Sequence, residues 1–372
     1  MIIGTPKEIK AHENRIALTP HVALELTRSG HDVLIEKTAG ESSGFSDNDY
    51  ESVGCEIINS SKEIFERADM IVKVKEPQPE EMAMCSPDLT MFTYFHFAAD
   101  EQLTKNFRDT GATAIAYETI MLEDHSLPLL IPMSEVAGRM AVQEGAKYLE
   151  KYHGGRGILL GGVPGVEPAT VTILGGGIVG TNAAHIAAGL GANVYIMDIN
   201  LNRLRYLDEI MPKNVHTIYS NQYNIREILS RTDLLVGAVL IPGAKAPKLV
   251  TRDMLSLMMP GSVIVDVAVD QGGCIETCKP TTHDDPIYEV DGIIHYCVAN
   301  MPGAVPYTST TALTNATNPY IQILANDGIT NALQNDASLL KGLNMFKGHV
   351  THQGVSDAFG LEYTKPEIAL KN

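Results

Sequence analysis

The sequence predicts an α/β protein with two doubly wound, largely parallel sheets. Short apolar runs rich in Val, Ile and Thr alternate with amphipathic stretches along almost the whole chain, a pattern typical of parallel sheets covered by helices on both faces. The length of 372 residues is enough for two such domains. A glycine-rich turn at residues 175–180 joins an apolar run to a helical stretch. Together these observations indicate two Rossmann-like domains.

The first third of the chain supplies six expected strands, separated by helical stretches such as residues 21–30. The expected strands lie at residues 1–5, 31–36, 55–59, 69–74, 90–95 and 112–117. Residues 125–134 contain two prolines and no helical period, so we expect the chain to cross there into a second domain.

The second domain should open with a long helix over residues 135–152, with Ser134 as its N-cap. Residues 307–335 have a helical pattern, and residues 336–372 form a polar, strand-poor tail that we expect to pack on the first domain. The predicted domains are therefore 1–128 with 307–372, and 129–306. Further strands are expected at residues 169–175, 193–198, 233–240, 262–269 and 293–299.

Composition excludes several classes of protein. The net charge of −17 opposes binding to a nucleic-acid backbone, which requires clustered Lys and Arg. No run approaches the roughly 18 apolar residues of a membrane span, and the first residues lack a basic start followed by an apolar segment, so we expect no membrane association and a cytoplasmic location. The five cysteines include no C-x-x-C pair, which favours reduced structural thiols.

The glycine-rich turn has the spacing G-x-G-x-x-G, with Gly175, Gly177 and Gly180. A lone match is weak, but this one ends an apolar strand and opens a helix, so backbone N–H groups and the helix dipole should face a pyrophosphate. Asp198 ends the next strand and should accept hydrogen bonds from ribose hydroxyls, which favours NAD over NADP. The nearby Arg203 weakens that preference, and a purely structural turn with a solvated Asp198 is the alternative.

Polar residues also follow several predicted strands at their carboxyl ends, where open parallel sheets bind ligands. In the first domain Lys75 and His96 directly follow strands, and Arg15 lies in the loop after the first strand. In the second domain Asp270 and Asn300 follow strands in the same way, and Asn300 is a candidate substrate-binding residue. The placement predicts a common site at the sheet edges.

These side chains suit a small substrate with a carboxylate beside a carbonyl or amine. Arg15 can hold a carboxylate bidentately, Lys75 can bind a carboxylate or carbonyl oxygen, and His96 can exchange protons near neutral pH. The alternatives are surface cations at Arg15 and Lys75, a core histidine at His96 and a turn or helix-cap residue at Asp270. Motifs of serine hydrolases, P-loop enzymes, zinc proteases and EF-hands are not found in the sequence.

Across essentially the whole chain these residues resemble the bacterial alanine dehydrogenases. The resemblance rests on GTPKEIKAHENRIALTP, VKVKEP, YFHFAAD, MSEVAGRMA, GGVPGV, LGGGIVG, VDVAVDQGG and HYCVANMPGAVP. The related transhydrogenase α subunit shares the nucleotide domain but extends toward membrane segments, and saccharopine-type lysine dehydrogenases are more distant. The resemblance implies reversible, NAD-dependent oxidative deamination of L-alanine to pyruvate and ammonia by a homohexamer with a discontinuous substrate domain.

The resemblance also implies roles for individual residues. It assigns substrate contacts to Arg15 and Lys75 and catalysis to His96 and Asp270. Cofactor contacts are implied at Ser134, Ile178, Val179, Asp198, Arg203, Ser220, Val239, Leu240, Val267, Ala268, Val269, Asp270, Lys279, Val298, Ala299, Asn300 and Met301.

Two departures from the family pattern bear on these implied sites. Lys279 stands where some members have arginine, which puts that cofactor contact in doubt. Ile323 and Asp327 replace the glutamate and histidine of a magnesium site, so we predict no metal.

The expected chemistry is hydride transfer from the alanine Cα to nicotinamide, followed by attack of water on an iminium. His96 would move protons to and from that water, and Asp270 would stabilise the cation. Tyr94, Leu130 and Met133 are candidates for the wall of a small substrate pocket. Two alternatives remain open: an NAD-dependent dehydrogenase of another small amino acid, and a non-catalytic NAD-binding protein.

Overall fold

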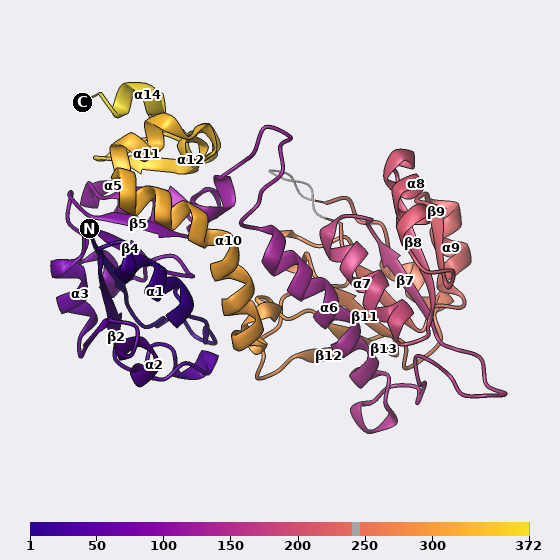
Figure 1. Cartoon of the computed structure of the whole chain (residues 1–372). Coiled ribbons are helices and arrows are strands. Elements are labelled where there is room, and N and C mark those ends of the chain that lie inside the picture. Colours follow the sequence, from indigo (N-terminus) through magenta and orange to yellow (C-terminus); the bar gives the residue numbers. More distant parts are fainter. Residues whose placement is uncertain (240–245, 372) are drawn as a thin grey trace. The chain divides into compact units, whose positions relative to one another are not determined.

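The computed structural model describes residues 1–239 and 246–371, and they form two compact units. The first unit consists of Met1–Met133 and Val305–Asn372, and the second of Ser134–Ala304. In Figure 1 the indigo and purple strands near the N-terminus and the yellow C-terminal helices accordingly belong to the same unit. Both units are α/β, as the sequence predicts.

The first unit contains an eight-stranded sheet with the order β15-β14-β6-β5-β4-β1-β2-β3. Strands β1 to β6 are parallel, whereas β14 pairs antiparallel with β6, and β15 antiparallel with β14. The strands are β1 (Ile2–Thr5), β2 (Asp32–Glu36), β3 (Glu56–Ile58), β4 (Met70–Val72), β5 (Thr90–Thr93), β6 (Thr113–Ala116), β14 (Leu343–Phe346) and β15 (His349–Val350).

Helices cover both faces of this sheet, and its central strands β4, β5 and β6 are buried at every position. In β4, Met70 and Val72 face one hydrophobic cluster and Ile71 faces another, because successive side chains of a strand point to opposite faces. The helices are α1 (Pro20–Arg28), α2 (Asp47–Glu51), α3 (Ser61–Arg67), α4 (Pro79–Met82), α5 (Glu101–Thr110), α10 (Pro306–Asp327), α11 (Ile329–Asn335), α12 (Ala337–Gly342), α13 (Gln353–Phe359) and α14 (Pro366–Ala369).

The C-terminal part of this unit differs from the prediction in two respects. The helical region expected over 307–335 is divided into α10 and α11 at Gly328, whose φ of 78° leaves the right-handed helical region. The prediction of a strand-poor tail is wrong, because β14 is fully buried and adds to the sheet beside β6. A four-residue strand is too short to give a clear alternating pattern in the sequence.

The second unit contains a seven-stranded sheet with the order β12-β13-β11-β10-β7-β8-β9, parallel except for β12. Its strands are β7 (Thr170–Leu174), β8 (Asn193–Asp198), β9 (Val215–Tyr219), β10 (Leu234–Gly237), β11 (Val263–Asp266), β12 (Ile287–Val290) and β13 (Ile293–Tyr296). Its helices include α7 (Ile178–Gly189), α8 (Leu201–Ile210) and α9 (Gln222–Leu229).

Strands β9 and β12 were not among the predicted strands. Strand β12 pairs with β13 through a tight turn at Asp291 and Gly292, both with positive φ. Asp-Gly between two apolar runs is a strong hairpin signal, so the sequence contained the information for β12. Strand β9 is mostly only half-buried at the edge of the sheet and shows little apolar patterning.

Helix α6 (Ile131–Tyr148) follows the crossing between the units. The predicted N-cap at Ser134 is wrong, since the helix begins at Ile131 and Ser134 lies in its first turn. A Cβ on Gly138 would lie 2.2 Å from the carbonyl oxygen of Val179, so this glycine allows α6 to contact the start of α7. Ser134 therefore lies one helical turn from a residue that touches the glycine-rich motif.

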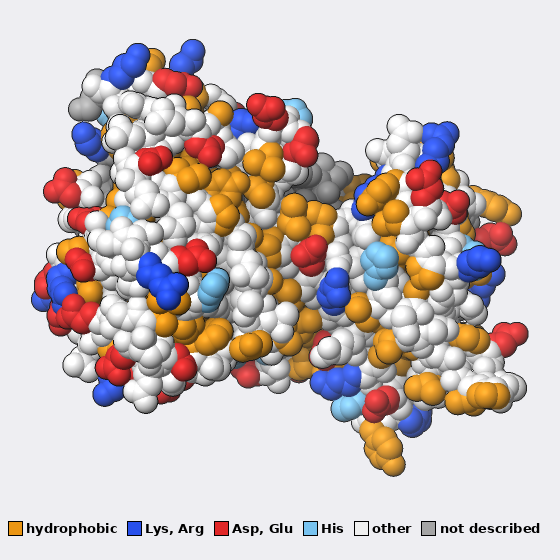
Figure 2. All heavy atoms as spheres, in the orientation of Figure 1, with side chains coloured by type: hydrophobic (Ala, Val, Ile, Leu, Met, Phe, Trp, Pro, Cys, Tyr) orange, Lys and Arg blue, Asp and Glu red, His pale blue; other side chains and the backbone are white. Residues whose placement is uncertain are grey.

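Two surface properties complete the description. In the described part of the chain, none of the helices combines the length and apolar content needed to cross a membrane. On the face shown in Figure 2, acidic and basic side chains are interspersed rather than gathered by sign.

Candidate active site and cofactor-binding site

The carboxyl edge of the first sheet brings together the three candidate residues of that unit. Strands β5, β4 and β1 are neighbours and parallel, so the segments that follow them start at the same edge. His96 follows β5, Lys75 follows β4, and Arg15 lies in the segment after β1. This is the arrangement that the strand-end argument predicts.

Arg15 is held by a neighbouring carboxylate. Its side chain is 2% exposed, and its Nε and Nη2 atoms donate to Glu13 Oε1 and Oε2 at 2.6 and 2.5 Å. Burial alone would lower the pKa of Arg15, but the hydrogen bonds and charge of Glu13 outweigh it and raise that pKa. A buried, oriented guanidinium does not fit the alternative of a surface cation.

Lys75 lies in a segment held by a second buried carboxylate. Glu8 Oε1 accepts hydrogen bonds from the backbone N–H groups of Val74 and Lys75 at 2.6 and 3.3 Å. Its other oxygen, Oε2, lies 3.0 Å from Nζ of the buried Lys73, which also pairs with Glu81 at 2.7 Å. Burial and the charge of Arg15 lower the pKa of Lys75. The charge of Arg15 therefore acts on Lys75, so these two cationic groups are electrostatic neighbours.

His96 is presented by an unusual backbone conformation. Its φ of 54° is left-handed, which few residues other than glycine adopt. Glu118 accepts hydrogen bonds from the backbone N–H groups of Phe95 and His96, at 3.2 and 2.6 Å to Oε1, and so stabilises this turn. The imidazole is exposed and parallel to the Tyr94 ring, with the ring centres 5.9 Å apart. An exposed imidazole excludes the alternative of a core histidine.

The residues proposed to line the pocket occupy the same part of this unit. Tyr94 is buried and its hydroxyl donates to the Leu129 carbonyl at 2.5 Å. Leu130 and Met133 pack on the same hydrophobic cluster as Tyr94, and Met133 Sδ lies 2.9 Å from Arg15 Nη1. Apolar side chains thus adjoin the guanidinium.

The G-x-G-x-x-G motif has the geometry of a dinucleotide site. Gly175 has a φ of 101°, as the tight turn requires, and a Cβ on Gly180 would lie 1.9 Å from the Gly175 carbonyl oxygen. A Cβ on Gly177, the N-cap of α7, would meet no atom within 4 Å, so the space in front of the helix is open. The N–H groups of the first turn of α7 lack intrahelical acceptors and are available to a phosphate.

Asp198 ends β8 beside this loop. Its Oδ2 accepts from the Gly176 N–H and its Oδ1 from the Asn200 N–H, each at 2.8 Å, so each oxygen keeps a lone pair for a ribose hydroxyl. Arg203 donates from Nε to the Gly176 carbonyl at 2.6 Å and from Nη2 to Thr181 Oγ1 at 2.7 Å. These bonds direct the guanidinium onto the protein, which favours an unphosphorylated ribose.

Most of the other expected cofactor contacts lie at the carboxyl ends of strands of the second sheet, on both sides of β7. Leu240 lies outside the described residues. Those described are Ser220 after β9, Val239 after β10, Val267, Ala268, Val269 and Asp270 after β11, and Val298, Ala299, Asn300 and Met301 after β13. The order of the chain reverses between β7 and β10, and open sheets bind ligands at such points.

Asp270, Asn300 and Lys279 have distinctive surroundings. Asp270 is exposed in a short turn, Val269–Gln271, directly after β11. Asn300 has a φ of 63°, and its carbonyl oxygen lies 3.1 Å from His283 Nε2. Lys279 is fixed by its backbone N–H, which donates to the Tyr288 hydroxyl at 2.8 Å, while its ammonium lies 4.7 Å from the centre of the Tyr288 ring.

Among the described residues, no group of three or more His, Cys, Asp or Glu side chains is arranged to hold an ion. Ile323 is half-buried in α10, and Asp327 is exposed at the end of that helix.

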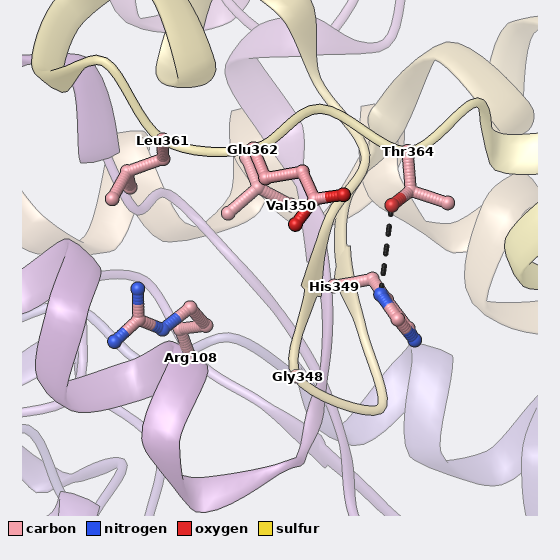
Figure 3. A pocket seen from close by; sticks show the side chains of 7 residues that line it. All are labelled: Arg108, Gly348, His349, Val350, Leu361, Glu362 and Thr364. Atoms are coloured by element: carbon pink, nitrogen blue, oxygen red, sulfur yellow. Dashed lines mark hydrogen bonds between the residues drawn. The ribbon is translucent and has the colours of Figure 1, made fainter.

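A pocket of about 240 Å³ lies elsewhere in the first unit (Figure 3). It adjoins the turn between β14 and β15, with Arg108 and Glu362 among its lining residues. Since β14 runs antiparallel to β6, this turn lies at the amino edge of the sheet, opposite to His96 and Lys75. It contains none of the predicted site residues.

Sequence reasoning missed the acidic residues that hold the site: Glu8, Glu13 and Glu118. Glu13 stands two residues before Arg15, which was a local signal for the pair. Glu8 and Glu118 act on segments 66 and 22 residues away, on other strands, so only the sheet topology could reveal them.

A dinucleotide loop on one sheet and cationic and titratable side chains at the edge of another are the arrangement of two-domain α/β oxidoreductases. Residues 4–137 match the family described as "Alanine dehydrogenase/PNT, N-terminal domain", and residues 141–353 match its "C-terminal domain". The chain therefore belongs to the alanine dehydrogenase/PNT family.

Individual relatives agree over the full length. The chain is 56% identical to the alanine dehydrogenase of Halomonas elongata, covering 98% of each, and 56% identical to that of Bacillus subtilis, covering 100% of this chain and 98% of that protein. A solved structure of an L-alanine dehydrogenase superposes with a TM-score of 0.95 at 52% identity, covering 97% of this chain and 99% of the other.

The environment of Asp198 predicts its effect on cofactor choice. Asp198→Ala removes the carboxylate that would bind ribose hydroxyls and repel a 2′-phosphate. The substitution should therefore weaken the binding of NAD and reduce the preference for NAD over NADP. Calorimetric titration of both cofactors measures this. Equal use of the two cofactors by the wild type, or an unchanged ratio in the variant, would contradict the assignment.

Proposed function

We propose that this chain catalyses the reversible, NAD-dependent oxidative deamination of L-alanine to pyruvate and ammonia. The first unit, Met1–Met133 and Val305–Asn372, holds the substrate, and the second, Ser134–Ala304, holds the cofactor. The observation that supports this most strongly is the arrangement of Arg15 and Lys75, two electrostatically linked cations at one sheet edge beside apolar side chains. Membership of the family supports the choice of alanine.

The second unit fits a nicotinamide dinucleotide. The open space at Gly177, the N-terminus of α7 and the two acceptor oxygens of Asp198 suit its pyrophosphate and ribose. When bound, NAD supplies the hydride acceptor for the hydrogen on the alanine Cα. Segment 267–270 and Asn300 complete the proposed site.

The protein residues carry the remaining steps. Arg15 and Lys75 bind the carboxylate and carbonyl oxygen of the substrate. In deamination, neutral His96 takes a proton from the water that attacks the iminium carbon, and in amination protonated His96 polarises the pyruvate carbonyl. The Asp270 carboxylate stabilises the positive charge of the iminium.

A panel of amino acids and 2-oxoacids, followed by NADH absorbance, tests the proposed substrate. We expect L-alanine and pyruvate to have the highest kcat/KM. One methylene shifts discrimination by only about 1 to 3 kcal/mol, so weak activity on 2-aminobutyrate or serine is compatible with the proposal. A much better substrate elsewhere in the panel would favour another amino-acid dehydrogenase. NAD binding without turnover would favour a non-catalytic role.

Replacing His96 tests the acid–base assignment. General acid–base catalysis contributes about 10² to 10⁴-fold, so His96→Ala should lower kcat by that amount in both directions. NADH affinity should change little, because His96 lies in the other unit from the glycine motif. Fluorescence titration measures the NADH affinity, and steady-state kinetics measure kcat in each direction. Near-normal turnover, or a loss confined to NADH binding, would refute this role.

We also propose that the protein is a homohexamer acting in the cytoplasm. The subunit number rests on the family resemblance, since a single chain does not reveal it. Sedimentation velocity at micromolar concentration should show a species of six chains, and a dominant monomer would defeat the proposal.

A further inference from the structure

The segment that carries Asp270 is bound at both ends by one buried carboxylate. Asp266, the last residue of β11, is fully buried. Its Oδ1 accepts the N–H of Ala268 at 3.1 Å, and its Oδ2 accepts the N–H groups of Cys274 and Ile275 at 3.0 and 3.3 Å. One carboxylate therefore joins both ends of the segment 267–275, with Asp270 between them.

Glycines make room for this carboxylate. A Cβ on Gly273 would lie 2.4 Å from Asp266 Oδ2, and a Cβ on Gly237 would lie 2.9 Å from Oδ1. Gly272 and Gly273 have φ values of 96° and 59°, so the chain turns back and aims the next two N–H groups at the carboxylate. The Gly-Gly pair thus has a structural purpose that its sequence alone did not show.

Lys248 holds the same segment from the other side. Its ammonium donates to the carbonyl oxygens of Gly272, Gly273 and Ile275, the latter two at 3.1 and 3.3 Å. The segment thus has its N–H groups bound by an anion and its C=O groups bound by a cation. Both interactions are charge-assisted, which makes them stronger than ordinary hydrogen bonds.

Burial of the Asp266 carboxylate carries a desolvation cost. Burial raises the pKa of Asp266 to about 6, while its three backbone hydrogen bonds and the charge of Lys248 act in the opposite direction. In the ionised form both oxygens are acceptors, and together they accept all three bonds. An apolar or amide side chain of similar size would avoid the desolvation but could not accept them all.

We propose that Asp266 and Lys248 are positioning residues that fix the segment 267–275 and thereby place the Asp270 carboxylate for the reaction. The proposal rests on the proposed function of Asp270 but concerns two residues that are outside the substrate and cofactor contacts. We call Asp266, Lys248 and their hydrogen bonds to segment 267–275 the brace. A catalytic group displaced by about 1 Å through a distant mutation can lower a rate about 10²-fold, so loss of the brace should lower kcat by displacing the Asp270 carboxylate.

Two variants separate the two halves of the brace. Asp266→Asn keeps one acceptor oxygen, so it can bind the N–H of Ala268 or those of Cys274 and Ile275, but not both. Lys248→Met removes the cation and keeps the length of the side chain, whereas Lys248→Arg restores a donor. Lys213→Met is the matched control, since Lys213 is an exposed lysine of the same unit.

Hydrogen–deuterium exchange of the peptide spanning 267–275 and steady-state kinetics are measured for each variant. Asp266→Asn and Lys248→Met should speed exchange in this peptide and lower kcat about 10-fold or more, with a smaller change in the KM for alanine. Lys248→Arg should recover part of both effects, and Lys213→Met should match the wild type. Thermal unfolding verifies that each variant is folded.

The outcomes distinguish failure of the positioning role from failure of the proposed function. Unchanged exchange in folded Asp266→Asn and Lys248→Met, or faster exchange with unchanged kcat, would overturn the positioning role. If Asp266→Asn does not fold, Lys248→Met and Lys248→Arg decide. If the wild type does not turn over alanine, the proposed function fails, while the exchange data still report whether the two residues hold the segment.

Discussion

The structure depends on carboxylates that accept backbone N–H groups where parallel strands end. Glu8 holds the segment after β4, Glu118 the turn after β5, Asp198 the glycine loop after β7 and Asp266 the turn after β11. At these points the sheet ladder stops, and its N–H groups need other acceptors. A buried or partly buried carboxylate supplies them and holds the segment that carries a proposed functional residue. The same device occurs in both units.

This arrangement explains how the proposed substrate site can contain so many charges. Arg15 and Lys75 would repel each other, but Glu13 pairs with the guanidinium, and the cluster of Glu8, Lys73 and Glu81 lies behind the lysine segment. A buried ion pair contributes little net stability, because desolvation offsets the attraction. Its value here is orientation: the charges would meet the proposed substrate without first having to reorganise.

The sequence predicted the parts of the fold that repeat a strong pattern. The central strands, the glycine motif and the strand-end positions of Lys75, His96, Asp198 and Asp270 could be found, because each depends on local periodicity or on one topological rule. Strand β14 could not, because its four residues are specified by their pairing with β6, over 200 positions earlier in the chain. The acidic partners of the loops were missed for the same reason.

Transfer of the Cα hydrogen tests the central claim most directly. L-alanine deuterated at Cα is incubated with NAD and the enzyme, and the reduced cofactor is analysed by mass spectrometry and proton NMR. The account predicts one deuterium at the nicotinamide C4 for each pyruvate formed. Pyruvate formed with the deuterium lost to water and none in the cofactor would contradict hydride transfer from alanine, and with it the role given to both units.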